Sequence, residues 1–485
     1  MMQNGGSKTP SVNVTKGSAY KWWALAVICI GTFTSTLDNS IVNVAIPTLG
    51  DTFNVGETIS VWVYLAYMLT VAGLTLTFGK TGDRFGRKRI YVIGLLISAL
   101  GLGLNSIAPS MGTLIAFRVV QAIGAGMMIA VGPAIITNVF PDQERGKAMG
   151  IYVASVGAGL TLGPALGGIL VDTLGWRSIF YMRLPIVLVV AALTLKKLRE
   201  QKSDESQHSF DKWGSAAFFI GMFALLLALN QSGELGWTSA LVLTSIIAAA
   251  VLLPAFVVIE RKVAQPVLDL MLFRSLSFSM ANLSLVLSFI SRISALFLMP
   301  FFLQDGLGYT ASKTGLVQIT VPIAMLVISP FAGRLSDRMG SRILTSIGFA
   351  MIGISLFLLS NIAAHSGTLS VVLSLAIMGV GIGLFESPNN SLIMGSAPLE
   401  KQGTASAMLS TSRGIGLTIG LAISSSIYAA RKQLLLAQST AEAAVIDSYG
   451  HTIIIVTFLC IAGIIASILA GNTRRNRPPR TQSHP

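Results

Sequence analysis

Long apolar runs recur along the whole chain, and only short polar segments separate them. Each run holds about 20 residues, which is enough for a helix to cross roughly 30 Å of hydrocarbon. Hydrophobic residues make up 53% of the chain and charged residues only 11%. The pattern predicts an all-α integral membrane protein with fourteen transmembrane helices, at residues 22–46, 60–79, 89–107, 112–138, 147–171, 179–196, 213–231, 238–259, 277–303, 314–333, 343–362, 368–394, 404–429 and 451–471.

The distribution of Lys and Arg predicts the orientation. An even number of spans puts both termini on one side, and basic residues concentrate on the side that also holds the termini. We therefore expect a multi-pass protein of the cell inner membrane with both termini in the cytoplasm. The net charge of +14 is then a topology signal and an attraction to anionic membrane lipid. Because this charge is dispersed over short loops, nucleic acid is not an expected partner.

Two short basic segments repeat one pattern, Gly-x-x-x-Asp-Arg-x-Gly-x-(Lys/Arg). They are residues 79–89 (GKTGDRFGRKR) and 333–342 (GRLSDRMGSR), after the second and tenth predicted spans. Equivalent positions in two halves predict a duplicated protein, with two six-helix halves around a two-helix insert. The predicted units are a cytoplasmic N-terminal tail (1–21), an N-terminal half (22–196), a cytoplasmic linker (197–212), the insert (213–260), a C-terminal half (261–471) and a basic cytoplasmic tail (472–485).

The charges in these segments suggest gating. A carboxylate paired with arginines can hold the ends of neighbouring helices together in one state and release them in another. Asp83 is also predicted to cap the helix that follows it. The alternative is an anchor that only fixes topology. The candidate gating residues are Gly79, Asp83, Arg84, Gly86, Arg87, Asp337 and Arg338.

Four motifs carry a family resemblance over nearly the whole chain. Beside segment 79–89 they are 37–47 (LDNSIVNVAIP), 118–126 (RVVQAIGAG) and 157–168 (GAGLTLGPALGG). Together they resemble the major facilitator superfamily, and specifically its fourteen-helix drug:proton antiporter branch. The resemblance implies multidrug efflux, and with it antibiotic resistance, by a proton-coupled antiporter that exports organic compounds by alternating access.

Asp38 is the first candidate for proton coupling. A carboxylate inside an apolar span is costly and tends to be functional, because it can take up a proton when buried and lose it when a cation arrives. Arg118, inside the fourth span, can tune that proton affinity. The alternative is a permanent structural pairing of Asp38 with Arg118 or with polar neighbours such as Asn39 and Asn43.

Three ionisable residues lie inside spans of the second half, namely Arg292, Glu386 and Arg413. Glu386 is a candidate for a second proton site or a substrate contact, and the two arginines are candidates for contacts to an anionic group. The alternative is ion pairing that fixes helix register. Further candidate substrate contacts, polar or aromatic, are Asn43, Tyr67, Phe385, Asn389 and Asn390.

The fifth span is marked by small residues. Gly157, Gly163, Pro164 and Gly167 permit close helix contact and a bend, which predicts a gate between the halves; ordinary packing is the alternative. Arg183 stands where the branch usually has asparagine. It is expected at the outer membrane boundary, with its side chain extended toward phosphate.

Several classes of function are not indicated. The chain carries no Gly-Lys-Ser/Thr phosphate loop with its preceding glycine-spaced turn, so neither an ATP-driven pump nor another enzyme is expected. Neither the two cysteines nor the four histidines show metal-ligand spacing, and no cofactor is expected. The expected partners are protons, membrane lipid and a lipophilic organic substrate, cationic or amphiphilic, bound by a monomer. A flippase or exporter of lipids and an organic-anion exporter remain alternatives.

Overall fold

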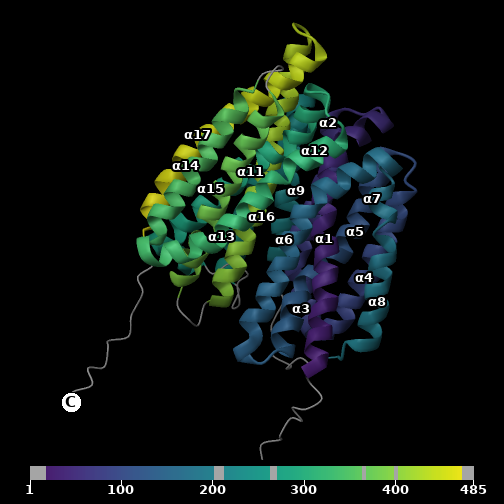
Figure 1. Cartoon of the computed structure of the whole chain (residues 1–485), viewed down its shortest axis with the longest axis vertical. Coiled ribbons are helices and arrows are strands. Elements are labelled where there is room, and N and C mark those ends of the chain that lie inside the picture. The colour runs from purple at the N-terminus through teal and green to yellow at the C-terminus, as the bar shows by residue number, and fades with distance from the viewer. Residues whose placement is uncertain (1–17, 201–211, 263–269, 363–366, 398–401, 472–485) are drawn as a thin grey trace, which may run out of the picture.

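The computed structural model describes residues 18–200, 212–262, 270–362, 367–397 and 402–471. These residues are almost wholly helical (Figure 1). The helices of the first part are α1 (Ser18–Phe53), α2 (Glu57–Ser60), α3 (Trp62–Phe85), α4 (Arg87–Ser106), α5 (Met111–Val139), α6 (Asp142–Leu174), α7 (Ser178–Tyr181), α8 (Leu184–Lys197), α9 (Lys212–Leu235) and α10 (Ala240–Lys262).

The second part continues the helical pattern. It contains η2 (Leu270–Arg274), α11 (Leu276–Phe301), η3 (Phe302–Gly306), α12 (Ala311–Gln318), α13 (Thr320–Met339), α14 (Ser341–Ser360), α15 (Thr368–Gly395), α16 (Gln402–Leu436) and α17 (Ala441–Ala470). The predicted linker 197–212 and the tails 1–21 and 472–485 lie largely or wholly outside the described residues, so their predicted roles stay predictions.

Twelve helices in the described ranges are long and apolar enough to cross a membrane. Two further long helices are not among them. The apolar stretch of α9 is shorter, at Ala216–Ser232, and α16 carries Arg413 among many small polar residues. The all-α membrane architecture is therefore confirmed, whereas the predicted number of fourteen transmembrane helices is not.

The helices form two bundles that converge at one end of the molecule (Figure 1). In the first bundle α1 packs on α6 and α4 on α5, and in the second α14 packs on α15 and α11 on α16 and α17. Each bundle has its own large cluster of buried apolar side chains. We call the end where α2 and α12 lie the closed end; α1 begins and α17 ends at the opposite end.

Helices α9 and α10 pack on each other, and α9 also contacts both bundles. Leu69 of α3, Met222 and Leu226 of α9, and Ala422 of α16 form one buried apolar cluster. On the α16 side, the hydroxyls of Ser232 and Ser426 lie 2.9 Å apart. Helix α9 therefore lies along one seam between the bundles, with α10 packed on it.

The two repeated basic segments form equivalent junctions. Gly86 joins α3 to α4 with φ +102°, and Gly340 joins α13 to α14 with φ +89°. Only glycine adopts such angles without strain. Polar loops were expected at both places, but in the structure a single glycine separates the two helices at each junction. Asp83 lies inside α3 and Gly86 occupies the cap position of α4. The side chain of Asp83 is outside the described structure, so its capping role stays a prediction.

Residues 431–450, between the last two predicted spans, are helical except for a turn at 437–440. Helix α16 continues to Leu436 and α17 begins at Ala441, so the two helices extend beyond the predicted spans to form a hairpin at the closed end (Figure 1). Thr440 caps α17 by accepting a hydrogen bond from the backbone N–H of Ala443, at 3.3 Å. The cap explains why the chain re-enters a helix so soon.

Candidate functional site

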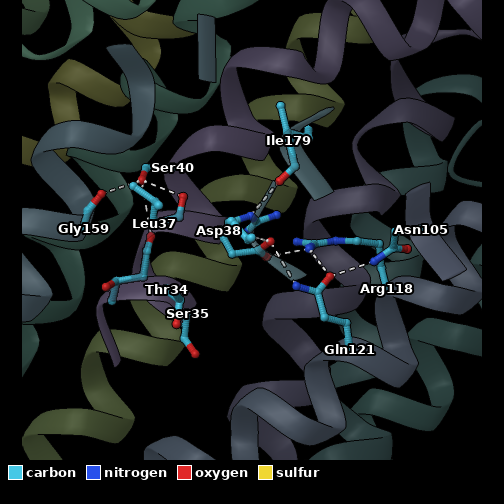
Figure 2. A network of polar contacts seen from close by, with 12 residues as sticks. Thr34, Ser35, Leu37, Asp38, Ser40, Asn105, Arg118, Gln121, Gly159 and Ile179 are labelled. Atoms are coloured by element: carbon cyan, nitrogen blue, oxygen red, sulfur yellow. Dashed lines mark hydrogen bonds and ion pairs between the residues drawn. The ribbon is translucent and has the colours of Figure 1, made fainter. Parts of the chain in front are cut away.

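The first buried charge cluster centres on Asp38 of α1 (Figure 2). Arg118 of α5 donates from Nη1 to Asp38 Oδ2 at 2.5 Å, and Gln121 donates from Nε2 to Asp38 Oδ1 at 3.0 Å. Gln121 Oε1 in turn accepts from Arg118 Nη1 at 2.8 Å and from Asn105 Nδ2 at 2.7 Å. The spacing of Arg118 and Gln121 on one helical face lets both reach the same carboxylate.

Arg183 also pairs with Asp38, from a position just before α8. Its Nε donates to the carbonyl of Ile179 at 2.6 Å, and its side chain is only 3% exposed. The expectation that Arg183 extends to the membrane boundary is therefore wrong. In this buried pair, each charge compensates part of the hydration that the other has lost.

Arg118 has further contacts beside those to Asp38 and Gln121. Its Nε donates to the carbonyl of Val63 at 3.1 Å, and its guanidinium lies 4.1 Å from the centre of the Tyr67 ring. Tyr67 is itself fully buried. The predicted substrate contact at Tyr67 is thus a stacking partner of Arg118 in this conformation.

The second charge cluster joins three helices of the other bundle. Glu386 of α15 accepts from Arg292 Nη1 of α11 at 2.9 Å and lies 3.1 Å from Arg413 Nη2 of α16. Arg292 stacks 3.7 Å from the centre of the Phe289 ring. The cluster is less enclosed than the first one, since the side chains of Glu386 and Arg413 are 15% and 36% exposed. Each cluster sets one carboxylate between two guanidinium groups and so carries one excess positive charge.

The amides and the aromatic residue near Glu386 have different environments. Asn389 is buried, donates to the carbonyl of Ala281 at 3.1 Å and accepts from Ser284 at 3.2 Å. Phe385 is buried edge-on against Phe349. Both residues therefore pack inside the bundle. The amide oxygen of Asn390 is buried and has no hydrogen-bond partner in the described structure.

The small residues of α6 serve two contacts. At Gly163 and Gly167 a Cβ would collide with Ser40 and Ile41 of α1, within the first bundle. Pro164 and the neighbouring Gly168 instead face α12 of the second bundle, where backbone atoms approach closely. Gly157 has open space around it. Close packing is therefore found along most of the motif but not at its first glycine.

Hydrogen bonds also join the bundles toward the closed end. Asn43 donates from Nδ2 to the carbonyl of Leu296 at 3.2 Å, and Gln304 donates to the carbonyl of Val44 at 2.9 Å. The backbone N–H of Ser312 donates to Asp172 at 2.7 Å. Asn43, predicted to contact substrate, here connects the two bundles.

The predicted gating charges are only partly described. The side chains of Asp83, Arg84 and Asp337 lie outside the described part of the structure. Arg87 donates from Nη1 to the carbonyl of Ala134 at 3.4 Å, and Arg338 is exposed. At Gly79, no atom of the described residues lies near the position of a Cβ. The gating role of these residues therefore stays a prediction.

Comparison with known proteins decides the family. The family model of the Major Facilitator Superfamily matches residues 28–421 and 281–483. The chain belongs to the Major Facilitator Superfamily. It is 35% identical over 452 residues to the riboflavin transporter RibZ of Clostridioides difficile, covering 92% of this chain and 97% of that protein. It is 36% identical over 402 residues to the multidrug resistance protein Stp of Mycobacterium tuberculosis, covering 83% and 74%.

Solved structures of low sequence identity share the major facilitator fold. A bacterial homolog of the human lysosomal transporter Spinster, in an inward-facing and unoccupied conformation, superposes with a TM-score of 0.70 at 15% identity, covering 93% of this chain and 97% of that one. The transporter PepTSo superposes with a TM-score of 0.67 at 15% identity, covering 92% and 98%. This chain is therefore a multi-pass membrane transporter of the superfamily, whose relatives include multidrug transporters.

Sequence reasoning missed Arg183 as a member of the site. Two signals were available in the sequence: an arginine in place of the asparagine usual for the resembling branch, and a first half with Asp38 already facing one buried arginine. Gln121 belongs to the motif at residues 118–126, but no role was predicted for it. Its position three residues after Arg118 places both side chains on one face of the helix.

Proposed function

We propose that this transporter exports organic compounds in exchange for protons, by alternating access between its two bundles. The carrying observation is that each of two carboxylates inside membrane spans, Asp38 and Glu386, lies between two guanidinium groups. A proton can replace a positive partner at such a carboxylate, and so can a cationic group of a substrate. Competition of this kind couples the movement of protons to the movement of substrate.

The two clusters suit different tasks. Asp38 is 1% exposed and held from α5 and from the residue preceding α8, which favours proton coupling without direct substrate contact. Glu386 is more exposed and lies where α11, α15 and α16 meet, which favours substrate binding or a second proton site. Arg118 and Arg183 would then compensate the charge of Asp38 when its proton leaves.

We infer that both termini are cytoplasmic, that α9 and α16 also span the membrane, and that the protein acts as a monomer. The basic junctions around Gly86 and Gly340 support this orientation. The closed end then faces outward, and the inter-bundle contacts of Asn43, Gln304 and Asp172 close the path there. The structure would correspond to a state open toward the cytoplasm.

Organic-anion export is a second candidate. Arg413 is the most exposed side chain of the second cluster, and its Nε has no hydrogen-bond partner among the described residues. A buried donor without a partner is costly, and an oxyanion of a substrate would satisfy it. The names of the relatives, a riboflavin transporter and a multidrug resistance protein, are compatible with flat organic substrates.

The proposal is tested in proteoliposomes with an imposed pH gradient. The probes are the cationic dye rhodamine 6G, the anionic dye carboxyfluorescein, riboflavin and a labelled lysolipid. Gradient-dependent transport of a dye or riboflavin supports the proposal, and the charge of the transported dye separates the two candidates. Transport of the lysolipid alone would contradict it and indicate a lipid flippase.

A further inference from the structure

A third group of charges lies at the closed end and belongs to neither cluster above. Asp51 at the end of α1 and Glu57 at the start of α2 come from the first bundle. Asp305 of η3 and Lys432 of α16 come from the second. All four line one cavity of about 300 Å³, so three carboxylates share the space with one ammonium group. We call these four residues the seam cluster.

Within the seam cluster Lys432 pairs with Glu57, across the seam between the bundles. Both side chains are largely buried, at 21% and 19% exposure. Tyr428 packs beneath them, its ring centre 5.9 Å from Lys432 Nζ. The hydrogen bonds of Asn43 and Gln304 nearby use neutral amides and backbone carbonyls. The two bundles are therefore joined by an ion pair between charged side chains as well as by hydrogen bonds between neutral groups.

Asp305 gives Lys432 a second possible partner, this time on its own bundle. Asp305 lines the same cavity as Lys432 of its own bundle and as Glu57 and Asp51 of the first bundle. With the closed end shut, Asp305 therefore faces two carboxylates across the seam. Separating the bundles would remove that repulsion and leave Lys432 beside Asp305.

We propose that the seam cluster is an ion-pair exchange latch: Lys432 holds Glu57 when the closed end is shut, and moves to Asp305 when the end opens. The latch rests on the alternating access proposed above, and it assigns positioning roles to Glu57, Asp305 and Lys432. Exchange between two carboxylates keeps the buried ammonium compensated in both states, which lowers the cost of opening. Small changes of charge would then bias the two conformations.

The two carboxylates make opposite predictions. Removing the charge of Glu57 breaks its direct contact with Lys432 across the seam. This loss outweighs the relief of the more distant repulsion between Glu57 and Asp305, so the open form is favoured. Removing the charge of Asp305 removes the repulsion and the competing partner, and favours the closed form. A partly exposed ion pair is worth up to about 1 kcal/mol, which corresponds to a change of roughly fivefold in the open-to-closed ratio for each variant. A merely structural role would move both variants the same way.

The test measures distances between spin labels at the closed end by double electron–electron resonance in nanodiscs. Cys29 and Cys460, both buried, are replaced by Ser, and labels are placed at the exposed positions Thr173→Cys and Gln438→Cys, one on each bundle. Glu57→Gln is expected to increase the long-distance population, and Asp305→Asn to decrease it. Arg431→Met removes an exposed charge next to Lys432 and is the matched control, expected to match the parent.

A second pair of variants keeps the test decisive if one variant misfolds. Lys432→Met leaves three carboxylates uncompensated and is expected to increase the long-distance population, whereas Lys432→Arg preserves the pair and is expected to resemble the parent. Shifts of equal sign for Glu57→Gln and Asp305→Asn, or no shift in either, would overturn the latch. Because these distances are measured without substrate, the latch can hold even if proteoliposomes show no proton-linked transport.

Discussion

The buried cluster around Asp38 makes a quantitative prediction about stability. Asp38→Asn removes one negative charge and leaves two guanidinium groups buried, at 0% exposure for Arg118 and 3% for Arg183. Removing one partner of a buried ion pair typically costs about 3–5 kcal/mol, because the remaining charge is uncompensated. Arg183→Met instead leaves the pair of Asp38 and Arg118 intact with a neutral sum. Its expected cost is below about 3 kcal/mol, mostly from lost packing and the lost bond to Ile179.

Thermal unfolding in detergent, followed with a thiol-reactive fluorescent dye, measures which of the two variants loses more stability. The two cysteines are buried in the described structure, so the dye reacts as the protein unfolds. Asp38→Asn is expected to lower the midpoint more than Arg183→Met does. The double variant Asp38→Asn/Arg183→Met is expected to recover part of the loss, since it buries one uncompensated charge instead of two. Asp447→Asn, the same change at an exposed position of α17, is the control.

The result that would refute this reasoning is an Asp38→Asn variant that unfolds at the temperature of the parent. Such a result would mean that the charge of Asp38 does not compensate the two arginines. Equal decreases of the unfolding midpoint for Asp38→Asn and Arg183→Met would also contradict this reasoning. They would mean that side-chain packing, not electrostatic compensation, accounts for most of the cluster's contribution to stability.

Three further predictions concern other parts of the structure. Gly168→Leu, whose Cβ would lie 2.1 Å from the carbonyl oxygen of Ala311, should prevent closure of the closed end and reduce dye transport at least tenfold, whereas Gly157→Ala, in open space, should leave it unchanged. Gly86→Ala should lower stability by about 1 kcal/mol, measured as a lower unfolding midpoint, because φ is +102° there. Glu386→Gln, at the proposed second proton site, should weaken the dependence of dye efflux on the pH gradient, and an unchanged dependence would exclude Glu386 from coupling.

The sequence predicts the architecture well because helices that cross a membrane require a recognisable pattern of apolar residues. Apolar runs must be long enough to cross the hydrocarbon, and buried charges must be few. The repeated segments around Gly86 and Gly340 indicated the duplication, and the structure places both at helix junctions of the same kind. Helix ends were less predictable, since α16 and α17 continue as a hairpin beyond the apolar stretch.

The candidate site was only partly predictable for a physical reason. Asp38, Arg118 and Glu386 could be selected as charges inside apolar runs, but their partners depend on how helices rotate against one another. Arg183 and Lys432 lie near span ends, where a sequence pattern is equally compatible with solvent or lipid headgroups. Only the packing within the first bundle shows that Arg183 turns inward to Asp38, and only the contact between the bundles shows that Lys432 pairs with Glu57.

Proton movement coupled to substrate tests the central claim most directly. Proteoliposomes that contain the pH-sensitive dye pyranine, with no initial pH gradient, are exposed to an inward gradient of the substrate identified in the transport panel, and protein-free liposomes are the control. Antiport predicts that the lumen becomes more alkaline as substrate enters. Substrate entry without a change of lumenal pH, or with acidification, would contradict proton-coupled export.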